Sequence, residues 1–376
     1  MARGAKIIAG LVLALAVFWL GFRLWPVASP SPEFRMAAID ELGVRSDRNL
    51  IGVSPVMTPL DYKNAASLRA KLGAYLEEAR RYGKLTPQTI VVFPEHIGTW
   101  LAAAGAPAAA YAAPNVDGAL AALAAADPIS FLAAYFRSSE KERAAAAIFR
   151  LRTQAMARDY QDIFGGLARD YGVTIVAGSI VLENPRVEDG RVVAGSGPLY
   201  NASAVFGPDG RAASALVLKV HPIPSESGFL AEGAAKGVPA FDTPAGRLGV
   251  LICADSWHPE LYRVLREEGA EVLAVPAFLQ PDGVWMAPWR GYVTPAPDDI
   301  DPRDPGRLTE GEAWRKYSMA TRAPAAGIRN GVTPFLRGDL WDLGDDGRTI
   351  ALGDGALLIG SETDGATITV VSLKTD

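Results

Sequence analysis

The sequence has a single cysteine, Cys253, and only three histidines in 376 residues. One cysteine cannot form a disulfide within the chain, and it cannot supply the ligands of a cysteine-rich zinc or iron–sulfur site. A cysteine in an apolar run is most often buried packing, although the same residue type serves as a nucleophile in enzymes. Cys253 is therefore either a core residue or a reactive one.

Two further kinds of feature are missing. Lys and Arg number 37 against 42 Asp and Glu, a net charge of −5, so the chain has no overall cationic field to attract nucleic acid. No glycine-rich phosphate-binding motif follows an expected strand. Hydrophobic residues make up 49% of the chain, which excludes disorder and a small scaffold that depends on disulfides. We expect a folded protein with a large core and no nucleic-acid partner.

The first thirty residues differ from the rest because residues 7–22 carry no charge. Arg3 and Lys6 precede this run and Arg23 follows it. The pattern predicts a membrane anchor within residues 1–30, with the N-terminus in the cytoplasm and the rest of the chain on the extracytoplasmic side.

Small residues at Ala28 and Ser29 leave a second interpretation open, a signal peptide that is cleaved to release a secreted or periplasmic protein. In both interpretations residues 33–376 form one exported domain.

Beyond this segment, short apolar runs alternate with amphipathic ones, which predicts an α/β fold. Residues 101–147 contain 21 alanines and residues 280–308 are rich in Pro and Asp, so both stretches are interpreted as insertions that reshape the pocket. We expect strands at 49–56, 89–93, 173–182, 200–206, 213–220, 247–252, 271–275, 339–350 and 356–371, and helices at 65–82, from 259 onward and at 311–326.

Cys253 lies at the end of an apolar run that predicts a strand, and a helix is expected to begin near Pro259. A side chain on such a strand-to-helix turn is presented above the edge of a sheet. The backbone N–H of the next residue, Ala254, is placed to bind a developing oxyanion. The position suits a nucleophile, provided that a base or a cation lies close enough to activate the thiol.

Two other expected strands end in residues that supply these groups. Glu95 follows the strand at 89–93, and Lys219 follows the apolar part of the strand at 213–220. Glu95 can carry a proton from the thiol to a leaving amine, and Lys219 can donate to an oxyanion. Taken singly, each is typical of a solvated turn or strand end. Together they favour a catalytic role for Cys253.

These residues occur in three ordered motifs: FPE ending at Glu95, KVHPIPSE beginning at Lys219, and ICADSWHPE around Cys253. In this order the motifs resemble those of the nitrilase superfamily, also called carbon–nitrogen hydrolases. The resemblance extends over most of residues 48–372 and includes VPAF at 275–278 and DDGR at 345–348.

The resemblance implies a four-layer α-β-β-α sandwich, commonly a homodimer, that needs no metal or organic cofactor. It implies a catalytic triad of Glu95, Lys219 and Cys253. Members often have a second glutamate after the lysine, here Glu226, which is thought to orient the lysine or the attacking water. The Ala254 N–H would share the oxyanion with the lysine.

The residues after the cysteine distinguish amide-cleaving branches from true nitrilases. True nitrilases tend to have Trp-Glu there, whereas Ala254 and Asp255 follow Cys253. We therefore expect a small-molecule amide or acyl-amide substrate, cleaved through a Cys thioester, with acyl transfer to an amine as the alternative and nitrile hydrolysis disfavoured. Asp255 and Glu260 are interpreted as structural, a turn or cap acid and a helix-dipole partner.

The three histidines each stand near a triad candidate in the sequence: His96, His221 and His258. If their strand ends converge, they form a three-histidine zinc site, so a metal hydrolase is one rival interpretation. A catalytically inactive, membrane-tethered binding module is another. In the favoured interpretation there is no metal, and His96 and Trp257 are candidate substrate-binding residues.

Overall fold

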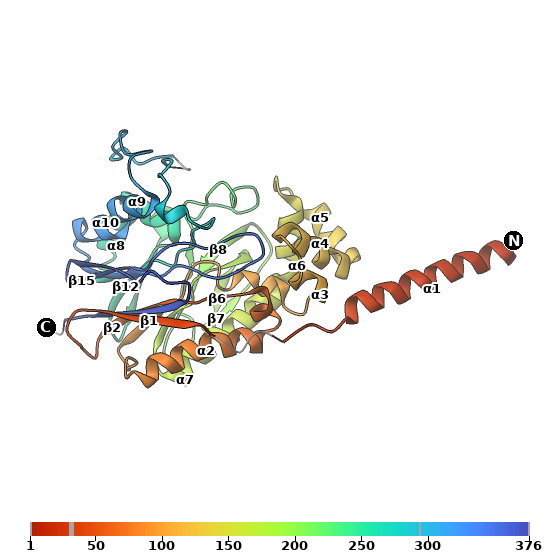
Figure 1. The fold of residues 1–376 in the computed structure, drawn as a ribbon, viewed down its shortest axis with the longest axis horizontal. Helices are drawn as coiled ribbons and strands as arrows, with labels where there is room; N and C mark the ends of the chain where they lie inside the picture. The colour runs from red at the N-terminus through yellow and green to blue at the C-terminus, as the bar shows by residue number, and fades with distance from the viewer. Residues whose placement is uncertain (1, 30–33, 293–294, 375–376) are drawn as a thin grey trace.

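Two six-stranded sheets form the centre of the molecule (Figure 1). The computed structural model describes residues 2–29, 34–292 and 295–374. The first sheet consists, in spatial order, of β1 (Met36–Leu42), β17 (Ala366–Ser372), β2 (Asn49–Ser54), β3 (Thr89–Val92), β4 (Thr174–Val176) and β9 (Val205–Phe206). The second consists of β11 (Ala240–Thr243), β12 (Gly246–Val250), β13 (Val272–Ala274), β14 (Asn330–Thr333), β15 (Ile350–Gly353) and β16 (Ala356–Ile359).

Two smaller sheets complete the strands. A three-stranded antiparallel sheet holds β10 (Val217–Leu218), β8 (Leu199–Ser203) and β5 (Ile180–Glu183), and β6 (Arg186–Glu188) pairs with β7 (Arg191–Val193). Each large sheet contains three neighbouring parallel strands. These are β2, β3 and β4 in the first sheet and β12, β13 and β14 in the second. Parallel strands present their carboxyl ends at one edge, where α/β proteins commonly place their sites.

Helices cover the outer face of each sheet, which gives four layers, α-β-β-α (Figure 1). Neighbouring residues of β2 show the layering, because Ile51 packs in the cluster that includes the first helix layer while Leu50 packs in the cluster that includes the second sheet. The four-layer fold class is confirmed. The first layer holds α2 (Ala65–Arg81), α6 (Arg143–Tyr160) and α7 (Gly166–Tyr171), and the second α8 (Pro259–Glu267), α9 (Glu310–Tyr317) and α10 (Met319–Ala325).

The two sheets approach closely where a side chain is absent. A Cβ atom at Gly52 on β2 would lie 2.5 Å from Val332 Cγ2 on β14, so only glycine allows this contact. Ser54 Oγ lies 3.1 Å from Thr349 Oγ1 across the same space. The short helical turns between the main elements are η1 (Pro59–Tyr62), η2 (Thr99–Ala103), η3 (Gln161–Gly165), η4 (Ala235–Gly237), η5 (Cys253–Trp257) and η6 (Val284–Met286).

The alanine-rich stretch forms a helical end of the molecule. It contains α3 (Ala108–Tyr111), α4 (Val116–Ala126) and α5 (Pro128–Arg137), which pack around a small apolar cluster separate from the two main cores. Helix α1 (Ala2–Leu24) projects from this end (Figure 1). Because alanine favours helix but offers little apolar area, the stretch forms helices without enlarging the main core.

The predicted membrane anchor is not shown by the fold. Within the described residues, no single helix is both long and apolar enough to cross a membrane, and the apolar stretch Val12–Leu24 of α1 falls short. Helices α4 and α5 meet at 111°. As a bent pair they are long and apolar enough to cross a membrane, by length and composition only. The boundary predicted between residues 30 and 33 lies outside the described residues.

Several predicted elements are divided in the structure. The strand predicted at 173–182 breaks at Gly178, whose φ is +60° and whose Cβ would lie 2.0 Å from Pro94 O. The helix predicted at 311–326 is two helices separated at Ser318. The strand predicted at 213–220 is only β10, and the strand predicted at 200–206 is β8 followed by β9.

One prediction was wrong in type, and five strands of the described residues were missed: β1, β6, β7, β11 and β14. No named strand lies within 339–349, because the ion pair of Arg337 with Asp345 and the packing of Trp341 on Trp100 hold this segment as a loop. Strand β1, absent from the prediction, pairs in parallel with β17. Its sequence MAAIDEL is short of β-branched residues, so propensity gave no signal for it.

Candidate active site

The Cys253 thiol lies on the turn that joins β12 to α8. The residue opens η5 with a φ of +49°, a left-handed conformation that non-glycine residues rarely adopt. Its backbone N–H donates to Pro276 O at 2.8 Å, and Sγ lies 3.7 Å from Phe278 O. The strand-to-helix turn predicted for Cys253 is therefore confirmed, and it holds the thiol at the carboxyl end of the second sheet.

Glu95 and Lys219 form a buried ion pair. Glu95 follows β3 and Lys219 follows β10, and both side chains are almost fully buried. Lys219 Nζ lies 2.7 Å from Glu95 Oε1. Two strand ends that are 124 residues apart in the chain thus meet, as the motif pattern predicted.

Glu226 lies on the other side of the Lys219 ammonium, and it too is buried. Its Oε2 is 2.5 Å from Lys219 Nζ and accepts a 2.9 Å hydrogen bond from the Ile223 N–H. The segment after β10 turns back on itself to bring Glu226 there. Lys219 is consequently held between two carboxylates, in an arrangement with little freedom to rotate away.

Asn201 is a member of this cluster that the sequence reasoning missed. It lies on β8 with 1% of its surface exposed, and its Nδ2 donates to Glu95 Oε1 at 3.0 Å and to Glu226 Oε1 at 2.9 Å. Its backbone O also accepts from the Lys219 N–H at 2.8 Å. An asparagine inside a predicted buried strand was the available signal, because a buried amide needs partners.

Charge and burial compete at Lys219 and Glu226. Burial alone lowers the pKa of Lys219, but the neighbouring carboxylates outweigh it and raise that pKa well above its usual value. Burial raises the pKa of Glu226, but the Lys219 ammonium and the His96 side chain outweigh it and hold that pKa far below its usual value. Both groups are therefore ionised at neutral pH.

The Cys253 thiol responds to the same charges. Burial raises its pKa most, the Glu95 carboxylate raises it further, and the Lys219 ammonium opposes both. The pKa of the thiol lies well above its usual value, so the resting thiol is neutral at pH 7. A nucleophilic attack by Cys253 therefore requires a base that accepts its proton, and Glu95 is the carboxylate that acts on the thiol most strongly.

Asp255 joins the Cys253 turn to the Lys219 strand. Its Oδ1 accepts from Val220 N at 3.0 Å and from His221 N at 2.8 Å, which agrees with the predicted structural role of a turn acid. Burial raises the pKa of Asp255 to about 7, although the Lys219 charge opposes the shift. Asp255 thus fixes the residues after Lys219 against η5.

His96 borders the carboxylate cluster. Its Nε2 lies 3.1 Å from Glu226 Oε1, and its Nδ1 lies 2.9 Å from Thr99 Oγ1. Its backbone N–H donates to Ser179 Oγ at 2.8 Å. The half-buried ring is close to the site, and the prediction that it contacts substrate stays a prediction.

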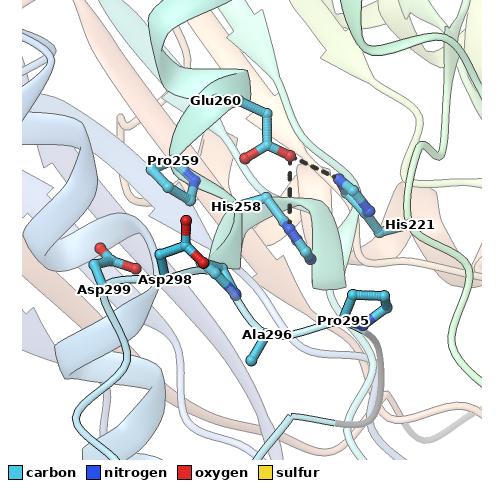
Figure 2. Close-up of a pocket in the computed structure, with 9 residues that line it drawn as sticks. His221, His258, Pro259, Glu260, Pro295, Ala296, Asp298 and Asp299 are labelled. Atoms are coloured by element: carbon cyan, nitrogen blue, oxygen red, sulfur yellow. Dashed lines mark hydrogen bonds and ion pairs between the residues drawn. The ribbon is translucent and has the colours of Figure 1, made fainter.

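His221 and His258 form a separate pair beside a cavity of about 640 Å³ (Figure 2). Their rings stack with centroids 3.5 Å apart, and the Glu260 carboxylate lies 3.1 Å from His221 Nε2. Asp298 and Asp299 line the same cavity. Burial lowers the pKa of both rings, that of His258 to about 4, so both are neutral at pH 7.

Among the described residues, the three histidines do not gather in one group, as the rival zinc interpretation would require. The groups with ligand atoms close enough to share a metal ion are His221 with His258 and Glu260, and Glu95 with His96 and Glu226. The zinc interpretation required one group that contained every histidine. The first group joins the segments after β10 and β12, and the second joins the segments after β3 and β10, so His96 is in a different group from the other two imidazoles.

Trp257 packs in an aromatic cluster with the loop at 280–308. Its ring lies 5.9 Å from that of Trp289 and 5.1 Å from that of Trp314, and Tyr292 Oη donates to its backbone O at 3.0 Å. Only 6% of the surface of Trp257 is exposed, so the structure shows it as a packing residue. The loop interpreted as an insertion is thus attached beside η5, while substrate contact by Trp257 and oxyanion donation by Ala254 stay predictions.

The chain belongs to the carbon–nitrogen hydrolase family, whose model matches residues 56–296. The matched range contains Glu95, Lys219, Glu226 and Cys253. The protein is accordingly an enzyme of the carbon–nitrogen hydrolase class, and the family expected from the motifs is confirmed.

Curated relatives match part of the chain. Among them are a probable hydrolase, YhcX, of Bacillus subtilis, 31% identical over 33% of this chain and 22% of its own, and a nitrilase of Pyrococcus abyssi, 38% identical over 30% and 37%. The omega-amidase NIT2 of Homo sapiens is 32% identical over 29% and 38%. The matched part of the chain spans less than half the length of each of these relatives.

Solved structures match most of the chain. An amidase from Nesterenkonia sp. has a TM-score of 0.52 and 18% identity, over 88% of this chain and 92% of that one. A mutant of that amidase, with acrylamide added to its active-site cysteine, also has a TM-score of 0.52, at 16% identity over 87% and 93%. These likenesses show the fold.

Proposed function

We propose that this enzyme hydrolyses the amide bond of a small molecule through a thioester on Cys253. The observation that carries the proposal is the buried Lys219 ammonium held 2.7 Å from Glu95 and 2.5 Å from Glu226, beside a neutral thiol at a strand end. This arrangement supplies a nucleophile, a proton acceptor and a fixed cation within one dry site.

In the first half of the reaction, Cys253 Sγ attacks the amide carbonyl while Glu95 accepts the thiol proton. The tetrahedral oxyanion is stabilised by the Lys219 ammonium and the Ala254 N–H. Glu95 then donates its proton to the leaving amine as the carbon–nitrogen bond breaks. The products are a free amine and an acyl thioester on Cys253.

In the second half, Glu95 accepts a proton from water, whose oxygen attacks the thioester carbonyl. The carbon–sulfur bond breaks, the acid leaves, and the proton returns to Cys253. One amide and one water thus give one acid and one amine. An amine in place of this water would give acyl transfer, the alternative outcome of the same thioester.

A panel of short-chain and acyl-chain amides tests the reaction. We expect acid release by the unaltered enzyme, an acyl adduct on Cys253 by mass spectrometry, and loss of both in Cys253→Ala. Cys253→Ala should unfold at nearly the same temperature, because the change removes one buried sulfur and no partner carboxylate. Turnover retained by Cys253→Ala would overturn the proposal. Adding an amine acceptor distinguishes hydrolysis from acyl transfer, because only transfer forms a new amide with the added amine.

We also propose that α1 anchors the enzyme to a membrane, with the catalytic domain on the extracytoplasmic side. Residues 7–22 carry no charge, and Phe18 and Leu24 on α1 are 76% and 72% exposed. The intact mass of the protein recovered from membranes tests this assignment. A mature chain that begins near residue 29 would show that the segment is a cleaved signal instead.

A further inference from the structure

Helix α5 has an exposed apolar face. Ile129, Leu132 and Phe136 are 82%, 51% and 79% exposed, and they lie three and four residues apart, so they share one side of the helix. Ala133 is exposed on the same side. Large apolar side chains gathered on one helix face are a feature of surfaces that bind a partner or a membrane.

The opposite face of α5 is already packed. Ala134 and Ser138 are buried, and Phe131 packs against the apolar cluster of α3, α4 and α6. Ser138 Oγ donates to Ala134 O at 3.0 Å and Asp127 caps the first turn. Helix α5 is therefore fixed to the protein by one face, and its exposed apolar face is the opposite one. This amphipathic helix is unlike a spanning one, and α4 likewise buries Ala119, Ala122, Leu123 and Ala126.

Helix α1 is held at the end of α4, close in the chain to the start of α5. Trp19 Nε1 on α1 donates to Ala125 O at 3.0 Å, and Arg23 donates to Ala126 O at 3.3 Å. Those two acceptors end α4, and α5 begins two residues later. Figure 1 shows α1 leaving the molecule from the end formed by α3, α4 and α5. The apolar surfaces of α1 and α5 are thus at the same end of the protein, and α1 is hydrogen-bonded to the end of α4 that precedes α5.

We propose that the exposed face of α5, Ile129, Leu132 and Phe136, lies in the interfacial region of a lipid bilayer beside α1. A bilayer is the occupant that accounts for both surfaces, because α1 exposes Phe18 and Leu20 beyond its contact with α4. No charged residue occurs between Asp127 and Arg137. Arg137 ends α5, and Lys141 and Arg143 follow it; all three are exposed and can meet lipid phosphates.

This contact would fix the orientation of the active site relative to the bilayer. The segment after α5 touches the loop that bears Glu226, since Glu142 N donates to Gly228 O at 3.0 Å. Phe149 on α6 also stacks on Phe229, with ring centroids 5.5 Å apart and planes within 5°. A bilayer at α5 therefore lies on the side of the site where this loop is held.

Depth-dependent quenching tests the proposal on the full chain. In a Cys253→Ala background, Phe136→Cys carries an environment-sensitive fluorophore, and Val44→Cys, 91% exposed in the β1–β2 loop, is the matched control. Each chain is placed alone in a nanodisc of phosphatidylcholine and phosphatidylglycerol with a doxyl-labelled lipid. We expect at least twofold quenching by doxyl lipid at position 136 and none at position 44, with iodide quenching in the opposite order.

A second variant excludes insertion driven by the fluorophore itself. Ile129→Ser with Leu132→Ser should at least halve the doxyl quenching at position 136, because the remaining face is polar. Equal iodide quenching at positions 136 and 44 would overturn the proposal. Shielding that appears only with two chains in one disc would assign α5 to contact between copies and overturn it as well. The outcome does not depend on the proposed reaction, since the Cys253→Ala background performs none.

Discussion

The side-chain amide of Asn201 donates a 3.0 Å hydrogen bond to the Glu95 carboxylate. The same Nδ2 donates to Glu226 at 2.9 Å, so one neutral residue holds both carboxylates that flank Lys219. Lys219 is therefore positioned by the carboxylates, and the carboxylates are positioned by Asn201. This dependence, together with the strained turns around the site, leads to four predictions.

Asn201→Leu should lower kcat by roughly 10- to 100-fold, because a hydrogen bond to a charged group contributes about 1.5–3 kcal/mol. The comparison is Asn64→Ala, which removes the N-cap of α2 and costs about 1 kcal/mol of stability. Amide turnover and urea unfolding are measured for both variants. If the two lose stability and activity in the same proportion, Asn201 has no positioning role.

Glu95→Gln should make the Cys253 thiol easier to ionise while it lowers turnover. The Glu95 carboxylate raises the pKa of Cys253, and removing that charge lowers this pKa, since the Lys219 ammonium remains. The pH midpoint for alkylation by iodoacetamide should fall accordingly while turnover drops by about 100-fold or more. Glu260→Gln, which changes a carboxylate that bonds His221, serves as the control. An unchanged midpoint in Glu95→Gln would contradict the proposed contact of carboxylate and thiol.

Lys219→Met should reverse the pH dependence of stability. In the unaltered enzyme the pKa of Glu226 is lowered, so its contribution is present above about pH 4.5 and is lost as the pH falls towards its folded value. Without the ammonium, burial raises that pKa, and stability is instead lost as the pH rises through it. Breaking a buried pair costs about 3–5 kcal/mol near neutral pH.

Urea unfolding at pH 5 and pH 7 measures this reversal. The variant should be more stable at pH 5, and adding Glu226→Gln should recover much of the loss at pH 7. A variant that is equally destabilised at both values would show that Lys219 acts through packing alone.

Gly178→Ala should damage both fold and activity. The φ of +60° disfavours any Cβ, and the new atom would lie 2.0 Å from Pro94 O, so the residue before Glu95 has to move. We expect a loss of about 3 kcal/mol or more and a clear fall in kcat. Gly172→Ala has nearly the same φ, +64°, with nothing within 4 Å, and should cost about 1 kcal/mol with kcat unchanged. If the two changes have equal effects on thermal unfolding and turnover, the positive φ alone, and not the contact with Pro94 O, causes the loss.

The site was more predictable than the fold's details. Glu95, Lys219 and Cys253 each end an apolar run, and strand ends gather at sheet edges, so their association follows from local pattern. Asn201 gave a weaker signal, because a single polar residue in a strand does not reveal its partners. Strand β1 gave none, since it forms only where β17, 330 residues later, offers an edge to pair with.

The sequence by itself determined the class of enzyme and the residues offered for its chemistry, because the motifs are local and their order is a property of the chain. Only the tertiary structure decided that His96 joins Glu226 while His221 stacks on His258, and that Asn201 bridges two carboxylates. These relationships depend on distances between segments far apart in sequence. Periodicity and motif spacing carry no information on such distances, because they result from the packing of whole layers against one another.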